Sequence, residues 1–238
     1  MKNETYLINL LFPVKCPFCG SFSGFRQIEK AGMCDKCASL DIFYKKADDL
    51  PHGALEKILR LYVPVRYTGT AKKAMIRYKF GGEEWLSKPF AAIMHSYLIS
   101  NGGYDDIDLI TWVPVSAKRF AVRGYDQSRL IAAQLSELSG KPCRKLLLRD
   151  NRPSGPSAAT VNMNYAARAA ATRFSPIDDS LKLYSERILL IDDIFTTGST
   201  LNECGGILLS MGALYVNAAC LMSGRQDIYD AESGEETA

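Results

Sequence analysis

Residues 187–200 read RILLIDDIFTTGST, and this stretch decides the fold. Its four apolar residues, 188–191, have the length of a buried strand and lead directly to two adjacent carboxylates, Asp192 and Asp193. A loop of small residues follows and runs into residues 199–211, which have helical periodicity. Ligands of open α/β sheets bind where the strands end, so we expect a binding site immediately after this strand.

The loop after the two acids has the composition of an anion site. It consists of Thr196, Thr197, Gly198, Ser199 and Thr200. Backbone N–H groups, four hydroxyls and the positive end of a helix suit a phosphate, and a glycine lets the backbone approach it closely. The acids would repel a phosphate but can accept hydrogen bonds from a diol, so the stretch predicts a site for a ribose 5-phosphate.

Two other phosphate motifs are absent from the sequence, because it contains neither a Walker A loop nor a glycine-rich dinucleotide fingerprint after a strand. The alternative interpretation is an acid-terminated core strand followed by a hydroxyl helix cap. Such a cap needs one hydroxyl rather than four around a glycine.

Strand-like and helical segments alternate on both sides of this stretch. Strands are expected at residues 63–67, 109–115, 144–148, 187–193 and 215–221, and helices at 70–78, 84–99, 127–138 and 199–211. Residues 150–164, rich in proline, serine, asparagine and glycine, are expected to form a long loop. The alternation predicts an α/β domain built from βαβ units on a parallel sheet.

Two C-x-x-C pairs lie near the start of the chain, with fourteen residues between them. They supply Cys16, Cys19, Cys34 and Cys37, the four thiolates that a tetrahedral structural zinc prefers. A redox C-x-x-C motif and two disulfides in an exported protein are the alternatives. The remaining cysteines, at 143, 204 and 220, are expected to be free thiols, the last two as small core residues.

Composition excludes several classes of protein. The chain has 238 residues, 47% of them hydrophobic and 23% charged, which argues against wholesale disorder and collagen-like repeats. Its mean hydropathy is −0.07, and no apolar run approaches the ~20 residues that span a bilayer. The apolar residues 9–14 run straight into Cys16 without a cleavage site, so we expect a cytoplasmic protein with no membrane partner.

Charge is distributed unevenly along the chain. The net charge of +3 is too small to indicate nucleic-acid binding by the whole chain. Residues 117–152 carry nine lysines and arginines against three acids, whereas residues 226–238 carry five acids and no base.

The cysteine pairs, the alternating elements and the acidic end together divide the chain into four parts. We expect a cysteine module at 1–44, a linker at 45–62, the main domain at 63–224 and an acidic tail at 225–238.

The stretch around Asp192 and Asp193 resembles the phosphoribosyl-pyrophosphate-binding motif of type I phosphoribosyltransferases. Nearly all of residues 5–222 resemble one branch, the ComF-like family linked to bacterial competence. The motifs that follow the cysteine module in that family's order are Tyr67-Thr-Gly, Tyr78-Lys-Phe-Gly, Val113-Pro-Val, Arg123-Gly-Tyr-Asp-Gln and the Asp-Asp loop. The resemblance implies a parallel-sheet type I phosphoribosyltransferase-like domain preceded by a small four-cysteine zinc ribbon.

The resemblance also implies roles for individual residues. Asp192 and Asp193 would bind the ribose hydroxyls, and residues 196–200 the 5-phosphate. A pyrophosphate loop would include Val115, Ser116 and Lys118, and residues 150–164 would form a flexible hood. The hood departs from the family pattern: Pro-Ser-Gly-Pro at 153–156 and the alanine-rich residues 166–171 stand where a glutamine and an arginine–asparagine pair are expected.

Two functions are compatible with these features. The first is a magnesium-dependent phosphoribosyltransferase, in which cations stabilise the leaving pyrophosphate and Arg123 and Arg149 are the best candidates. The second is a non-catalytic accessory protein in DNA uptake that docks a helicase-like partner or single-stranded DNA. Basic residues at 144–152 and exposed aromatics, Phe18 and Phe22, could then contact a strand; alternatively these aromatics form the ribbon's own core.

Overall fold

The structure is a computed structural model, and it describes residues 15–22, 33–44, 55–149 and 174–224. At its centre is a parallel sheet with the strand order β1-β7-β6-β3, in which β2 also pairs with β7. The strands are β1 (Leu61–Tyr62), β2 (Val65–Arg66), β3 (Leu109–Trp112), β6 (Arg187–Phe195) and β7 (Tyr215–Ser223). Every pairing in this sheet is parallel, which confirms the predicted α/β architecture.

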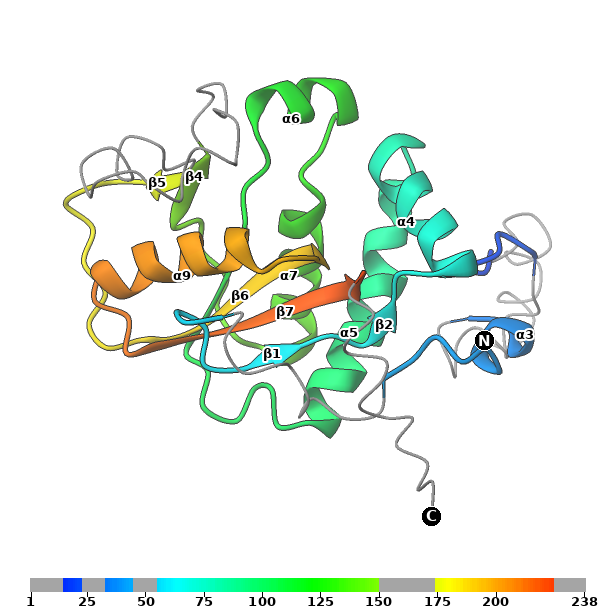
Figure 1. The fold of residues 1–238 in the computed structure, drawn as a ribbon, viewed down its shortest axis with the longest axis horizontal. Helices are drawn as coiled ribbons and strands as arrows, with labels where there is room; N and C mark the ends of the chain where they lie inside the picture. Colours follow the sequence, from blue (N-terminus) through cyan, green and yellow to red (C-terminus); the bar gives the residue numbers. More distant parts are fainter. Residues whose placement is uncertain (1–14, 23–32, 45–54, 150–173, 225–238) are drawn as a thin grey trace, which may run out of the picture.

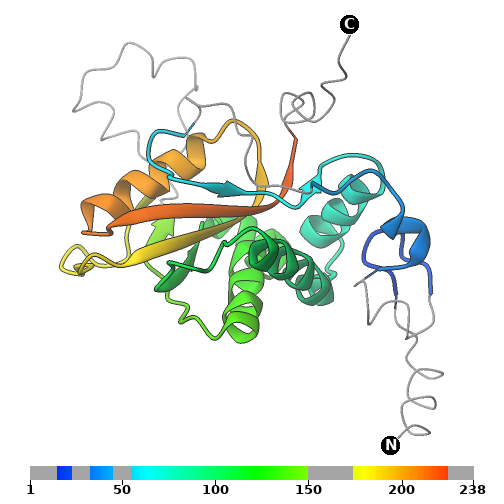
Figure 2. The same cartoon turned by 90° about the horizontal axis from the view of Figure 1, so that it is seen from below.

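Helices cover both faces of the sheet. In Figure 2, α9 (Ser199–Ser210) lies over one face, and α5 (Ser87–Ser100) and α7 (Gln127–Ser139) lie under the other. Burial on both sides explains why the apolar half of β6, from Ile188 to Ile191, is a continuous run rather than an alternating pattern. The same burial leaves the polar end of β6 at the edge of the core.

α4 (Gly69–Phe80) lies beyond the ends of β6 and β7 (Figure 1). A short 3-10 helix, η1 (Glu84–Leu86), follows it in the chain, and α6 (Ala117–Arg123) contacts the last residue of α4 through Arg123, which lies over the Phe80 ring. α6 was not predicted. It buries no residue, so it leaves no hydrophobic periodicity to detect. The residue types at its two ends are nevertheless typical of helix boundaries. Ser116 caps its start, and Gly124, with φ of 81°, ends it.

Two short strands form a separate antiparallel pair, β4 (Leu147–Arg149) with β5 (Phe174–Pro176). The expected hood, residues 150–164, lies between them and outside the described residues. β5 is tied to α9, because the Glu203 carboxylate accepts a hydrogen bond from the backbone N–H of Phe174 at 3.2 Å. The base of the predicted hood is therefore joined to the helix that follows the predicted phosphate loop.

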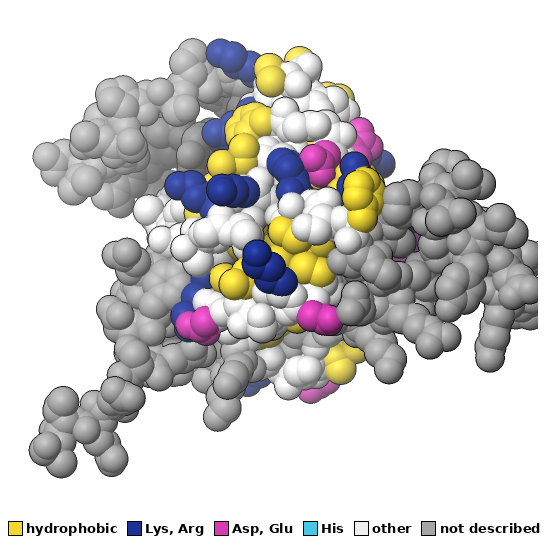
Figure 3. Space-filling view, turned by 90° about the vertical axis from the view of Figure 1, so that its right-hand side faces the viewer, with side chains coloured by type: hydrophobic (Ala, Val, Ile, Leu, Met, Phe, Trp, Pro, Cys, Tyr) yellow, Lys and Arg dark blue, Asp and Glu magenta, His cyan; other side chains and the backbone are white. Residues whose placement is uncertain are grey.

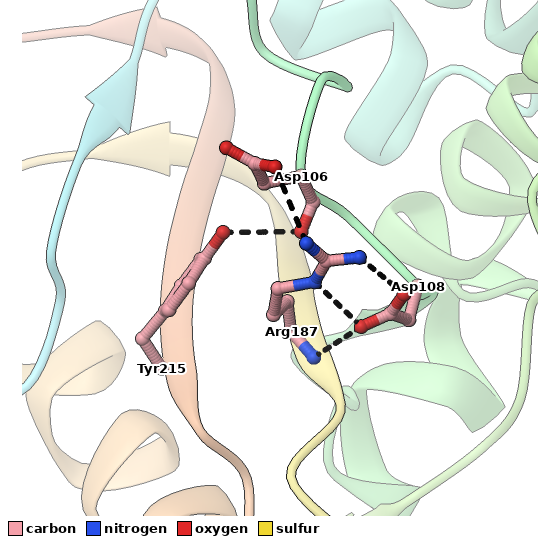
Figure 4. A network of polar contacts seen from close by, with 4 residues as sticks. All are labelled: Asp106, Asp108, Arg187 and Tyr215. Carbon is pink, nitrogen blue, oxygen red and sulfur yellow. Dashed lines mark hydrogen bonds and ion pairs between the residues drawn. The ribbon is translucent and has the colours of Figure 1, made fainter.

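The opposite end of the sheet is held by a polar network (Figure 4). The Arg187 guanidinium donates to both carboxylate oxygens of Asp108 at 2.8 Å and to Asp106 at 3.2 Å. The Tyr215 hydroxyl donates to the Asp106 carbonyl at 3.0 Å. These contacts join the beginnings of β3, β6 and β7, which fixes the register of the strands that carry the acids to the other end.

The cysteine segment packs against the main domain rather than standing apart from it. The Phe18 ring is buried and lies 5.8 Å from Phe43 and 6.2 Å from Phe90 of α5, centroid to centroid. Of the two interpretations of the ribbon's aromatics, a core position holds for Phe18, which packs against the main domain, whereas Phe22 is 64% exposed. The segment includes the short helix α3 (Asp35–Ala38).

The region between the cysteine segment and the first strands also contacts the sheet. The backbone N–H of Leu59 donates to Val216 of β7, and that of Lys57 donates to the Asn202 side chain of α9. The division of the chain at residues 44, 62 and 224 stays a prediction. Among the described residues, no helix is both long enough and apolar enough to cross a membrane.

Candidate functional site

The two predicted acids lie at the end of β6, where the strand leaves the core. Asp193 is nearly buried, with 9% of its surface exposed, and Asp192 is half-buried. The Lys79 ammonium of α4 lies 2.8 Å from Oδ1 of Asp193 and forms an ion pair with it. Sequence analysis quoted Lys79 within a family motif but assigned it no role, because the two residues are 114 positions apart.

Asp192 has different partners from Asp193. One carboxylate oxygen of Asp192 accepts hydrogen bonds from the Ser128 hydroxyl at 3.1 Å and from the backbone N–H of Asp193 at 2.8 Å. Loss of solvent around the carboxyl group, and then the charge of Asp193, raise the pKa of Asp192, and Lys79 and Ser128 oppose the rise. The adjacent carboxylates therefore differ in partner, exposure and charge compensation.

Two residues separate the predicted phosphate loop from the pair of acids. Gly198 has φ of 82°, in the left-handed region, which accounts for the glycine at this turn. Thr196, Thr197 and Ser199 are exposed, and the Thr197 hydroxyl donates to the Ser199 hydroxyl at 3.1 Å. Gly198 offers α9 no side-chain cap, although the N–H of Ser199, the first residue of the helix, donates to the Thr197 hydroxyl at 3.4 Å. The following N–H groups and the hydroxyls of the loop, including that of Thr200, suit an anion.

The residues assigned to a pyrophosphate loop lie between β3 and α6. The Val115 backbone N–H donates to the Asp126 carboxylate at 3.2 Å, and the Ser116 hydroxyl caps α6 by accepting from the Arg119 N–H at 3.3 Å. Lys118 is exposed on α6. Asp126 also caps α7, so this buried acid, which sequence analysis did not single out, braces the loop from behind.

The two candidate arginines occupy different elements. Arg123, at the end of α6, donates to the Gln127 side chain at 2.9 Å and lies over the Phe80 ring at 4.9 Å. Arg149 lies on β4, over the Phe174 ring at 5.0 Å. Contacts therefore link Arg123 to the end of α4 that carries Lys79, whereas Arg149 belongs to the β4–β5 pair at the base of the predicted hood.

Hydrogen bonds between tyrosine hydroxyls and backbone carbonyls join α4 to the first residue of α7 and to the segment before it. The Tyr78 hydroxyl donates to the Gln127 carbonyl at 2.9 Å, and the Tyr125 hydroxyl donates to the Tyr78 carbonyl. Both tyrosines are buried, and burial raises the pKa of each, so both hydroxyls stay protonated donors near neutral pH. This bracing fixes the backbone of Tyr78, next to Lys79.

The four N-terminal cysteines form a second candidate site. All seven cysteines lie in the described residues and none forms a disulfide, and the sulfurs of Cys16, Cys19, Cys34 and Cys37 lie within 4.8 Å of one another. Cys19 Sγ is 3.7 Å from Cys34 Sγ. Four sulfurs at ~2.3 Å from a tetrahedral ion lie about 3.8 Å apart, so the cluster has the geometry to hold a metal.

Comparison with known proteins finds similarity to competence proteins. No protein-family model matches it. It is 28% identical over 194 residues to the competence protein ComFC of Streptococcus pneumoniae, which covers 81% of this chain and 77% of that protein. It is 27% identical over 146 residues to ComFC of Bacillus subtilis, covering 61% of this chain and 56% of that protein.

Two further similarities are shorter or weaker. Over 64 residues the chain is 36% identical to an adenine phosphoribosyltransferase of Rhodospirillum rubrum, covering 27% of this chain and 37% of that protein. A solved structure described as the allosteric regulatory enzyme of purine biosynthesis aligns with 61% of this chain and 29% of its own, at 16% identity and a TM-score of 0.42. The similarity to competence proteins spans most of the chain, and the described residues form a parallel α/β sheet with acids and a hydroxyl loop at the end of β6. The chain is therefore similar over most of its length to a competence protein of the ComF type, and its described residues form a parallel-sheet α/β fold.

Proposed function

We propose that the protein binds phosphoribosyl pyrophosphate with magnesium at the end of β6 and transfers its phosphoribosyl group to a nucleophile. One observation carries the proposal: a half-buried acid and a hydroxyl-lined helix start lie within a few residues of each other at the carboxyl end of a central strand. A ribose 5-phosphate offers a diol to the acid and a phosphate to the helix start.

The chemistry needs electrostatic stabilisation more than covalent participation. The bond between the anomeric carbon and pyrophosphate breaks, pyrophosphate leaves with the electron pair, and the nucleophile bonds to the same carbon. Magnesium, when bound with the substrate, would neutralise pyrophosphate oxygens. Among the chain's own groups, Arg123 and Lys118 would stabilise the leaving group, and Arg149 would act from the base of the hood.

Isothermal titration calorimetry with phosphoribosyl pyrophosphate and magnesium tests the binding part. We expect the wild type to bind and Asp192→Asn to weaken binding by roughly tenfold or more, since one hydrogen-bonded charge is worth ~1.5–3 kcal/mol. Asp179→Asn is the control, because Asp179 is an exposed acid away from β6. Absence of heat with the wild type rejects the proposal, and so does an unchanged affinity of Asp192→Asn.

We also propose that the four-cysteine cluster holds a structural zinc and that the protein is cytoplasmic. The sulfur geometry supports the metal, and seven cysteines without a disulfide suit a reducing compartment. Elemental analysis of the purified full chain should find about one zinc per chain. To check the location, the chain is tagged with a protease cleavage site and the matching protease is expressed either in the cytoplasm or outside it. Cleavage only by the cytoplasmic protease is expected, and cleavage only by the external one would contradict the proposal.

A second candidate function is an accessory role in competence, in which the fold docks a helicase-like protein or single-stranded DNA. The names of the relatives favour it, as does the surface around α4, where Lys and Arg side chains lie beside apolar ones (Figure 3). The exposed apolar side chains on α4 and α6 are Ile76, Phe80, Phe120 and Val122. Stacking and phosphate contacts require such aromatic and basic groups.

Fluorescence anisotropy with a labelled single-stranded oligonucleotide separates the two functions. Phosphate-driven binding should weaken steeply as salt is raised from 50 to 200 mM. Phe120→Ser should weaken the binding of the oligonucleotide relative to the wild type and leave the affinity for phosphoribosyl pyrophosphate unchanged. Binding that is absent, or that ignores salt, removes DNA from the second candidate and leaves a protein partner.

A further inference from the structure

Lys79 and Asp193 form a nearly buried ion pair inside the proposed ligand site. Their side chains are 16% and 13% exposed, and their charged atoms are 2.8 Å apart. Lys79 comes from the last turn of α4, and Asp193 from the end of β6. A buried charge without a partner costs several kcal/mol, so this contact compensates the burial of both side chains.

The pair gives the two acids different surroundings. Oδ1 of Asp193 already faces the Lys79 ammonium, and its carboxylate is nearly buried. Asp192 is half-buried and is oriented by Ser128 and a backbone N–H, whose bonds fall on one of its oxygens. The other oxygen of Asp192 is thus better placed to accept from a ligand than either oxygen of Asp193.

Lys79 is itself held in place by its neighbours in α4. Arg77 donates to the carbonyls of Pro17 and Phe18 at 2.6 and 3.3 Å, and Tyr78 is bound at both its hydroxyl and its carbonyl. A lysine on a braced backbone loses less freedom in forming an ion pair than one on a loose segment. The ammonium is therefore a fixed charge rather than an adaptable surface group.

We propose that Lys79 is a positioning residue of the ligand site: it holds the Asp193 carboxylate against α4 and thereby leaves Asp192 as the acid that accepts from the ribose diol. The inference rests on the proposed function, because it divides the roles of two acids within that site. It revises the expectation that both acids bind the diol in the same way.

The first experiment measures the affinity for phosphoribosyl pyrophosphate and magnesium by calorimetry. Lys79→Met should weaken binding roughly tenfold, which corresponds to ~1.4 kcal/mol. Lys79→Arg should restore affinity to within about threefold, because it keeps the charge beside Asp193. Lys73→Met is the matched control: it removes an exposed lysine from the same helix and should leave affinity unchanged.

The second experiment is a double-mutant cycle with Asp193→Asn. If Lys79 acts through Asp193, adding Lys79→Met to Asp193→Asn should change affinity by less than about twofold. A further tenfold loss in the double variant would mean that Lys79 contacts the ligand itself, and would overturn the inference. The double variant leaves no unpaired buried charge, so this comparison decides the matter even if Lys79→Met alone fails to fold.

Different results would reject the proposed function and the role of Lys79. A wild type that does not bind the ligand rejects the proposed function. If the wild type binds the ligand and Lys79→Met binds it with the same affinity, only the role of Lys79 is rejected. If Asp193→Asn binds the ligand more weakly than Asp192→Asn does, the assignment of Asp192 as the acid that accepts from the diol is also rejected.

Discussion

Asp108 uses both carboxylate oxygens to hold Arg187, the first residue of β6. One oxygen accepts from the Arg187 backbone N–H at 2.9 Å and from its side chain at 2.8 Å, and the other accepts from the guanidinium at 2.8 Å. The Arg187 hydrogen bonds hold the pKa of Asp108 well below its usual range. This residue anchors the end of the sheet opposite the proposed site.

Asp108→Asn should therefore change how stability depends on pH. A carboxyl whose pKa is depressed by folding contributes stability above its unfolded pKa, near 4, and loses that contribution as pH falls through its folded pKa. We expect the variant to unfold at lower urea concentration than the wild type at pH 7, and the gap to shrink below about pH 4. Urea titrations at pH 7, 4 and 3 measure this.

The control for this prediction is Asp179→Asn, which removes an exposed acid from the loop before β6. Its urea midpoint should match that of the wild type at pH 7. A gap between Asp108→Asn and the wild type that stays constant from pH 7 to pH 3 would contradict an electrostatic origin.

At the level of secondary-structure elements, the sequence predicted those with a strong pattern. The continuous apolar run of β6 and the periodic residues of α7 and α9 predicted these elements to within a few residues. β5 is only three residues long, and α6 has no buried face, so neither leaves a pattern. The ion pair of Lys79 with Asp193 depends on tertiary packing across 114 positions, which no local pattern encodes.

The turn between α9 and β7 contains the glycine with the most crowded surroundings among these elements. Gly212 has φ of 109°, and a Cβ there would lie 2.2 Å from the Leu183 carbonyl oxygen. Gly212→Ala should destabilise the protein by roughly 2–4 kcal/mol, because left-handed strain and a backbone clash add. Chemical denaturation followed by circular dichroism measures the loss.

Gly140, at the end of α7, offers a matched comparison. It also has positive φ, 71°, but a Cβ there would meet no atom within 4 Å. Gly140→Ala should cost only about 1–2 kcal/mol, the strain of the left-handed conformation alone. Equal losses in the two variants would show that the approach of Leu183 does not matter.

Across the whole molecule, α4 connects the cysteine cluster to the proposed ligand site. Its last turn contacts the first C-x-x-C turn through Arg77, and two residues later Lys79 contacts Asp193. Phe18, within that C-x-x-C turn, is buried against Phe90 of α5. The cluster is thus part of the support for α4 as well as a metal site.

Metal removal should loosen the cysteine segment before it affects the sheet. A structural zinc stabilises its own turns, so Cys34→Ser should hold less than about 0.2 zinc per chain, and Cys143→Ser, outside the cluster, should keep about one. Two amides report on the first turn, since Cys16 N–H donates to the Ser21 carbonyl and Gly20 N–H to the Cys16 carbonyl, both at 2.9 Å. In Cys34→Ser these amides should exchange with deuterium at least tenfold faster, while those of β6 and β7 keep their protection because the sheet buries them independently.

Two other results would contradict this prediction. Amide exchange that rises equally in the cysteine segment and the sheet would mean that the whole fold depends on the metal. Unchanged exchange at Cys16 and Gly20 would mean that packing of Phe18 alone holds the turn.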